Sequence, residues 1–260
     1  MNRRDFLKQT NFAVAGLLLP RLQFRTKHLI FIVSCGARKR DYYENQYLSP
    51  NIHRLAREAF VFEQDHCERV ASHDVAFIEL LQGREFHPAD NTRYPTILDY
   101  IGNAIQVDSI RKIPRALQDH EPRIVVCREA SHEVGHNSYE EYLRVVKTTD
   151  ESIGAVLNWV KADPRFSHST SIVIRPEFGR DDEVNEHGQL HHSYGFYYTH
   201  RVASIFWGPD FDTGIDRTTV IHSLDMAPTL THLFGVDAIH AQGSIIPKLF
   251  RFLARTERNH

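Results

Sequence analysis

The run His28-Leu29-Ile30-Phe31-Ile32-Val33-Ser34 decides the fold of this 260-residue chain. Its residues are mostly apolar and several are β-branched, a pattern typical of a strand buried on both faces of a parallel sheet. Three similar runs follow it: residues 123–127 (RIVVC), 171–174 (SIVI) and 202–207 (VASIFW). The sequence therefore predicts four buried strands of one sheet.

Helical patterns separate these runs. Ser49-Pro50 predicts a helix start, and apolar residues from Ile52 to Ala59 and Phe60 recur at helical spacing behind it. Further helices are predicted after Tyr94-Pro95-Thr96, at 226–234, and at 138–161, where Ser138 and Glu141 form a capping box. Strands that alternate with helices, with no linker between them, predict one doubly wound α/β domain over residues 26–260, with helices on both faces of a mostly parallel sheet.

The composition excludes some classes of function and draws attention to histidine. The hydrophobic fraction is 42%, the charged fraction 25% and the formal net charge −2, so no basic surface for nucleic acid is predicted. Three cysteines do not make a disulfide framework. Histidine is abundant, at 17 residues. Because histidine is the commonest metal ligand and the usual acid or base at neutral pH, its positions carry the functional argument.

The N-terminus has the pattern of an export signal. Arg3-Arg4 precedes an apolar stretch at residues 12–19 (FAVAGLLL) that is too short to span a bilayer. The paired arginines resemble the bacterial twin-arginine signal. We therefore expect residues 1–25 to be a signal segment and the protein to be periplasmic. No small-residue cleavage site follows, so residues 5–20 are also a candidate membrane anchor.

Polar side chains follow three of the predicted strands. In doubly wound sheets, ligands bind beyond the carboxyl ends of the strands. Imidazoles and carboxylates that converge there from several segments are the ligands of zinc, manganese or iron. The alternative is a polar rim that satisfies its own hydrogen bonds. The residues after these strands that carry such groups are Cys35, His132, His136, Glu177, His191 and His192.

Four further stretches resemble the alkaline phosphatase superfamily, which includes sulfatases and phosphodiesterases. Residues 49–56 (SPNIHRLA) are similar to its T-P-N-L-D-R-L-A helix, and 77–84 (FIELLQGR) to its L-L-T-G-R helix. Residues 150–154 (DESIG) and 225–230 (DMAPTL) also match family motifs. The resemblance covers about residues 28–253. It implies a doubly wound α/β fold, one or two divalent metals, a hydroxyl or cysteine-derived nucleophile and a small anionic ester as substrate.

The catalytic motifs depart from the family pattern. Cys35-Gly36 stands where the family has Asp-Gly, and His132 replaces the aspartate of D-x-x-G-H. Phe178 replaces a metal-binding histidine. Counting back nine or ten residues from Gly83 to the nucleophile position gives Asp74 or His73 instead of a hydroxyl residue. The resemblance therefore implies an altered ligand set: Cys35, Asp74, His132, His136, Glu177, and His191 or His192.

These residues support an exported, metal-dependent hydrolase of phosphate or sulfate esters. We expect a divalent metal, zinc first and manganese, iron or calcium after it, to activate a water for attack on the ester. Asp74, Glu177 and Arg180 are the expected catalytic residues, with Arg180 binding the anionic group by paired hydrogen bonds. The alternative is an inactive relative that binds a periplasmic protein partner and needs no metal. A third hypothesis, an unrelated ester hydrolase built on Ser72 and His73, lacks an orienting acid in the sequence.

Overall fold

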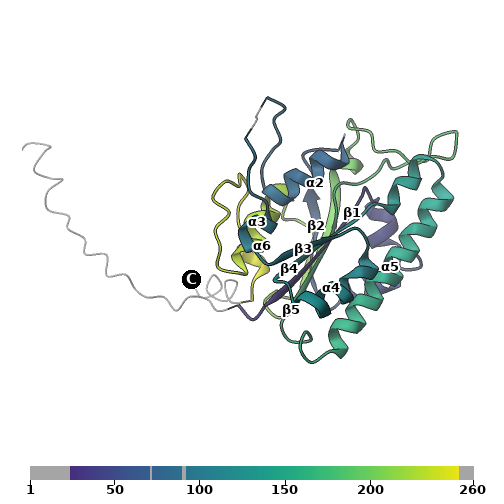
Figure 1. Ribbon diagram of the computed structural model, residues 1–260. Coiled ribbons are helices and arrows are strands. Elements are labelled where there is room, and N and C mark those ends of the chain that lie inside the picture. Colours follow the sequence, from purple (N-terminus) through teal and green to yellow (C-terminus); the bar gives the residue numbers. More distant parts are fainter. Residues whose placement is uncertain (1–23, 71, 90–91, 252–260) are drawn as a thin grey trace, which may run out of the picture.

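The computed structural model describes residues 24–70, 72–89 and 92–251 (Figure 1). The predicted signal and anchor lie outside the described residues, except for residues 24 and 25. Within the described part of the chain, no helix combines the length and the apolar character needed to cross a membrane.

One mixed sheet of eight strands forms the centre of the molecule, in the order β3-β4-β1-β5-β6-β2-β7 with β8 beside β2. All its pairings are parallel except those of β6 with β5 and with β2, so β6 alone runs against the others. The strands are β1 (His28–Ser34), β2 (Phe60–His66), β3 (Ala104–Val107), β4 (Ile124–Glu129), β5 (Thr170–Pro176), β6 (Arg201–Trp207), β7 (Gly214–Asp216) and β8 (Ile221–His222).

Helices cover both faces of this sheet (Figure 1). Ile30 and Ile32 of β1 pack in a core with α1, α4 and α5, whereas Leu29, Phe31 and Val33 pack with α2, α3 and α6 on the other face. This alternation is the consequence of the period of two in a strand. The helices are α1 (Pro50–Ala56), α2 (His73–Gln82), α3 (Ile97–Ile101), α4 (Ile113–His120), α5 (Tyr139–Ala162) and α6 (Met226–His232), with shorter turns η2 (Arg40–Glu44), η3 (Ile110–Lys112), η4 (Ser131–His136), η5 (Tyr197–His200), η6 (Ser223–Asp225) and η7 (Pro247–Leu249).

The predicted α/β class and its four buried strands are confirmed as β1, β4, β5 and β6. One helix prediction is wrong at its end. Ala59 and Phe60 continue the apolar spacing of α1, but α1 ends at Ala56 and Phe60 begins β2. The run Phe60–Phe62 is buried because it pairs with β6 and β7 inside the sheet, a tertiary contact that outweighs the local helical pattern.

Candidate metal centre

The loops at the carboxyl edge of the sheet meet as predicted. Cys35 directly follows β1, η4 follows β4, and Glu177 directly follows β5. Two more segments reach the same place: the first turn of α2, which carries His73, and the loop before η5, which carries His192. Five segments thus contribute side chains to one site.

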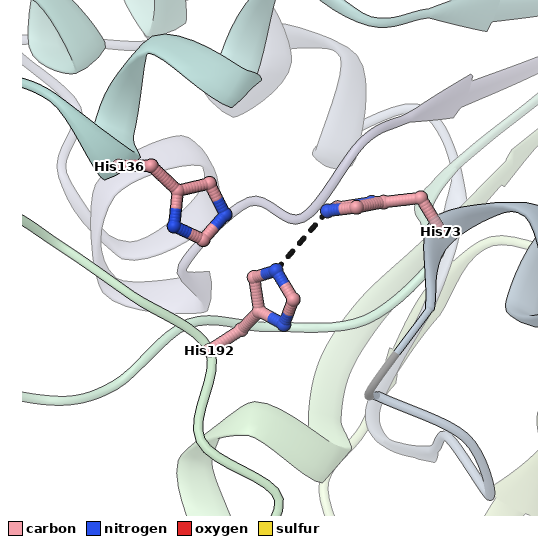
Figure 2. A group of neighbouring side chains, drawn as sticks. All are labelled: His73, His136 and His192. Carbon is pink, nitrogen blue, oxygen red and sulfur yellow. Dashed lines mark hydrogen bonds between the residues drawn. The ribbon is translucent and has the colours of Figure 1, made fainter.

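Two groups of side chains there have donor atoms within 4.8 Å of one another. The first consists of His73, His136 and His192, all half-buried. Figure 2 shows the three rings turned toward one another, with His73 and His192 joined by a dashed line. The second consists of Cys35, His73 and Glu177, so His73 belongs to both.

Hydrogen bonds fix the tautomers of His73 and His192. The Nδ1 atom of His192 lies 2.7 Å from the carbonyl oxygen of Val70, and the Nδ1 atom of His73 lies 2.7 Å from Oε2 of Glu177. A carbonyl and a carboxylate only accept, so each Nδ1 carries the proton. A ring protonated only on Nδ1 keeps a lone pair on Nε2, and the two Nε2 atoms lie 3.1 Å apart.

His136 is fixed through a longer chain. Its Nδ1 atom lies 2.8 Å from Nδ1 of His191, whose Nε2 lies 3.2 Å from Oε1 of Gln189. The amide oxygen accepts, so His191 carries its proton on Nε2 and accepts at Nδ1 from His136. His136 therefore also has an unprotonated Nε2. A hydrogen bond from the other ring nitrogen is the usual support of a metal-binding histidine, and all three rings have one.

Burial keeps the His136 and His192 rings neutral. Burial, and then the charge of Arg180, lowers the pKa of His136 to about 4, while burial and His73 lower that of His192 to about 4. Phe178 packs against His73 and His192, with ring centroids 4.6 and 4.7 Å away. The phenyl ring that replaces the expected family histidine therefore holds two other imidazoles in place.

Glu133 adds a carboxylate to the three imidazoles. Its Oε1 lies 2.8 Å from Nε2 of His73 and its Oε2 3.9 Å from Nε2 of His136. The carboxylate is 46% exposed and lines the adjoining cavity. Without a metal, Nε2 of His73 donates its proton to this carboxylate, and a bound metal ion would displace that proton. Three imidazole nitrogens fit a divalent first-row metal, zinc above all, whereas calcium prefers an all-oxygen set.

The second group is already satisfied by hydrogen bonds. The buried Glu177 carboxylate accepts from Nδ1 of His73, from Nε of Arg128 at 3.1 Å and from Sγ of Cys35 at 3.5 Å. Burial, and next the charge of Glu177, raises the pKa of the Cys35 thiol, which favours the protonated donor over the thiolate that binds metals. The geometry thus makes Glu177 a support for His73 and leaves Cys35 in the hydrogen-bond network.

Arg180 is held by backbone carbonyls and by Glu133, whose Oε1 lies 3.6 Å from its Nη2. Its side chain is fully buried and donates to three backbone carbonyls: Nε to Gly36 at 2.5 Å, Nη1 to Leu190 at 2.7 Å and Nη2 to His132 at 2.8 Å. The expectation that Arg180 binds the anionic group is therefore corrected. It is a positioning residue that joins the loops after β1, β4 and β5, and Nη1 would lie 3.1 Å from a Cβ at Gly135.

Three other expected ligands lie outside both groups. The carboxylate of Asp74 is 86% exposed and pairs with Arg128 at 2.7 Å. His132 is buried against Tyr142, with 6.0 Å between ring centroids and no hydrogen-bond partner at Nδ1. His191 supports His136 instead of joining the cluster. Of the predicted set, His136 and His192 lie in the histidine cluster, and Cys35 and Glu177 lie beside it.

His73, Arg128 and Glu133 are the site residues that the predicted set omits. The count back from Gly83 offered His73 beside Asp74, and both lie in the first turn of α2, whose N-cap is Ser72. The His73 ring contacts Glu177 in the site, whereas the Asp74 carboxylate is 86% exposed. Ser72 Oγ accepts from the amide of Val75 at 3.5 Å. The hydroxyl of the third hypothesis is thus engaged at the helix start, although His73 does have an orienting acid, Glu177.

A cavity of about 600 Å³ opens beside the cluster. It is lined by Cys35, His73, Gln106, Val107, Asp108, Lys112, Arg128, Ala130 and Glu133. The size suits one small organic ligand. Its charged lining consists of two cations, Arg128 and Lys112, and two carboxylates, Asp108 and Glu133.

Several solved structures share this architecture. No family model and no curated protein matches the sequence. A 2-O GAG sulfatase aligns with a TM-score of 0.66 at 15% identity, over 86% of this chain and 74% of its own. A protein solved with its substrate D-glucosamine-2-N,6-O-disulfate gives 0.63 at 12%, over 87% and 82%. The phosphonate monoester hydrolase of Silicibacter pomeroyi gives 0.63 at 9%, over 85% and 76%. These likenesses, together with the sheet order and the helices on both faces, show that this chain has the fold of the sulfatase and the phosphonate monoester hydrolase.

Proposed function

We propose that the chain is an exported, metal-dependent hydrolase of a small anionic ester, a sulfate or a phosphate. The observation that carries this proposal is the convergence of three imidazoles whose Nδ1 protons are all committed elsewhere. The names of the similar structures, sulfatases and a phosphonate monoester hydrolase, support the ester class.

His73, His136 and His192 would hold the metal, with Glu133 as the adjoining carboxylate. A zinc ion bound there would supply a Lewis acid that polarises the ester and lowers the pKa of water. Glu177 holds His73 in the tautomer that presents Nε2. Phe178 is fully buried and packs against both the His73 and the His192 ring, so it excludes water from that side of them.

Water is the nucleophile in this proposal. Neither group of candidate ligands contains a serine or threonine, and the nearby Ser72 hydroxyl caps α2. Glu133 lines the cavity, and its exposed carboxylate is placed to accept a proton from a water that enters there. No covalent intermediate on a hydroxyl is needed.

Metal content tests the proposal directly. Protein purified without chelators should contain about one equivalent of zinc, manganese or iron per chain by mass spectrometry, and His136→Ala should lose it. His120→Ala is the matched control, because His120 is an exposed residue at the end of α4, outside the cluster. Hydrolysis of aryl sulfates and phosphates should follow the metal in the same variants.

A metal-free wild-type protein that also refuses added zinc would overturn this function. The result would favour the alternative, an inactive relative that binds a periplasmic partner, for which Phe178 and the protonated Cys35 are the supporting observations. Export is tested separately. A folded reporter fused to residues 1–25 should leave the cytoplasm, and the double change Arg3→Lys and Arg4→Lys should retain it.

A further inference from the structure

Arg128 is the cation that the cavity presents beside the histidine cluster. It lies at the end of β4 and its side chain is 24% exposed. The cavity wall includes it together with His73 and Glu133. Arg180, the cation expected for this task, is committed to three carbonyls. The anion-binding role is therefore open, and Arg128 has the right place for it.

Its guanidinium is held firmly at one end and loosely at the other. Nε donates to the buried carboxylate of Glu177 at 3.1 Å, and the group lies over the Phe77 ring at 4.8 Å from the centroid. Nη1 donates to Oδ1 of Asp74 at 2.7 Å. For Nη2 the described part of the chain offers no hydrogen-bond acceptor. The edge formed by Nη1 and Nη2 thus has one exposed partner and one open donor.

Asp74 is an exchangeable partner. Its carboxylate is 86% exposed, whereas that of Glu177 is fully buried. An ion pair to so exposed a carboxylate is weak and easily replaced by another anion. A carboxylate also resembles a sulfate or phosphate group in charge and in the spacing of its oxygens, which is why arginine binds both in paired fashion.

We propose that the Nη1–Nη2 edge of Arg128 binds a tetrahedral oxyanion of the substrate, and that Asp74 occupies Nη1 when no anion is present. The inference rests on the proposed function for the identity of the substrate and adds the residue that recognises its charge. Lys112 lines the same cavity and pairs with the exposed Asp108 at 2.6 Å. It contributes a second, weaker attraction for the same anion.

Opposite effects of two substitutions test this proposal. The probes are inorganic sulfate and inorganic phosphate, titrated by calorimetry at low ionic strength into full-length protein before and after removal of metal by a chelator. Arg128→Lys keeps the charge but loses the planar edge, and should raise the Kd about tenfold, the loss of a charge-assisted hydrogen bond. Asp74→Asn removes the competing carboxylate from an exposed position and should lower the Kd by roughly threefold.

Arg115→Ala is the matched control, because Arg115 forms a similar ion pair with Asp119 on α4 and lines no part of this cavity. Its Kd should equal that of the wild type. An Asp74→Asn protein that binds no more tightly than wild type, with Arg128→Lys unchanged, would overturn the inference. Metal content is measured on the same samples. If the protein holds one metal per chain but Arg128→Lys does not change the Kd, this inference is rejected and the metal proposal stands. The Arg128 and Asp74 effects in a metal-free wild type support it while rejecting the metal proposal.

Discussion

At the scale of single residues, each histidine of the cluster depends on the partner of its other ring nitrogen. Glu177, Val70 and His191 take the Nδ1 protons and leave the Nε2 atoms for a ligand. These partners carry no catalytic group to the substrate. They decide which tautomer is present, and so decide whether three neighbouring imidazoles form a metal site or a hydrogen-bonded chain.

Glu177→Gln should weaken metal binding without removing any proposed ligand. The amide keeps the shape but lacks the charge that holds His73, Arg128 and Cys35. Loss of such a supporting carboxylate lowers metal affinity by about 10- to 100-fold. Competition with a chelator of known zinc affinity measures this change. Glu140→Gln, at an exposed position on α5, should leave the affinity as it is; equal affinities in both variants would reject the supporting role.

His132 should make the metal-free protein sensitive to mild acid. Burial, and then Arg180, lowers its pKa to about 3, so below about pH 6.5 the unfolded chain binds a proton that the folded chain refuses. The free energy of unfolding therefore falls with falling pH, by about 1.4 kcal/mol per pH unit from this group. His132→Leu removes the titrating ring, so the urea midpoint of unfolding should change less between pH 6.5 and 4.5 than it does in the wild type. His136 and His192 keep part of the slope, and an unchanged slope would contradict the assignment.

At the scale of secondary structure, the sequence predicts elements that are buried or capped locally. The run 28–34 marks β1 and Ser138 marks the start of α5 correctly, because apolar continuity and cap chemistry are local signals. The Glu141 carboxylate pairs with Arg144 instead of completing the predicted capping box. Strand β2 is missed because Phe60 continues a helical spacing and owes its strand conformation to β6 and β7. The local sequence is also insufficient to identify the site residue. His73 and Asp74 are adjacent in sequence, and the way α2 begins at His73 determines which of the two side chains enters the site.

Ser72→Ala separates the cap of α2 from the chemistry. Ser72 accepts from the amide of Val75, so its loss should cost about 1 kcal/mol of folding stability. Metal content and ester hydrolysis should persist at a temperature where the protein stays folded. Ser169→Ala is a suitable control, since its exposed hydroxyl only donates to the carbonyl of Arg165. A selective loss of hydrolysis in Ser72→Ala, with normal metal content, would revive the hypothesis of a serine nucleophile.

At the scale of the whole molecule, the histidine cluster joins parts of the chain that the sheet alone leaves independent. His73 belongs to the helix layer that packs on β1 with α3 and α6, whereas His136 belongs to the turn that leads into α5 on the other face. His192 comes from the loop between β5 and β6. A ligand held by all three would tie both helix layers to the edge of the sheet, and so favour the folded state over any partly opened one.

Zinc should therefore raise the unfolding temperature of the whole protein. At a free concentration about 100-fold above the Kd, binding adds about 2.7 kcal/mol of stability, which corresponds to roughly 5–10 °C for a domain of this size. Differential scanning calorimetry of chelator-treated protein, with and without zinc, measures the shift. Calcium should produce none, because a nitrogen-rich set does not suit it. His136→Ala should abolish the zinc shift and His120→Ala should keep it; a zinc shift that survives in His136→Ala would place the metal elsewhere in the molecule.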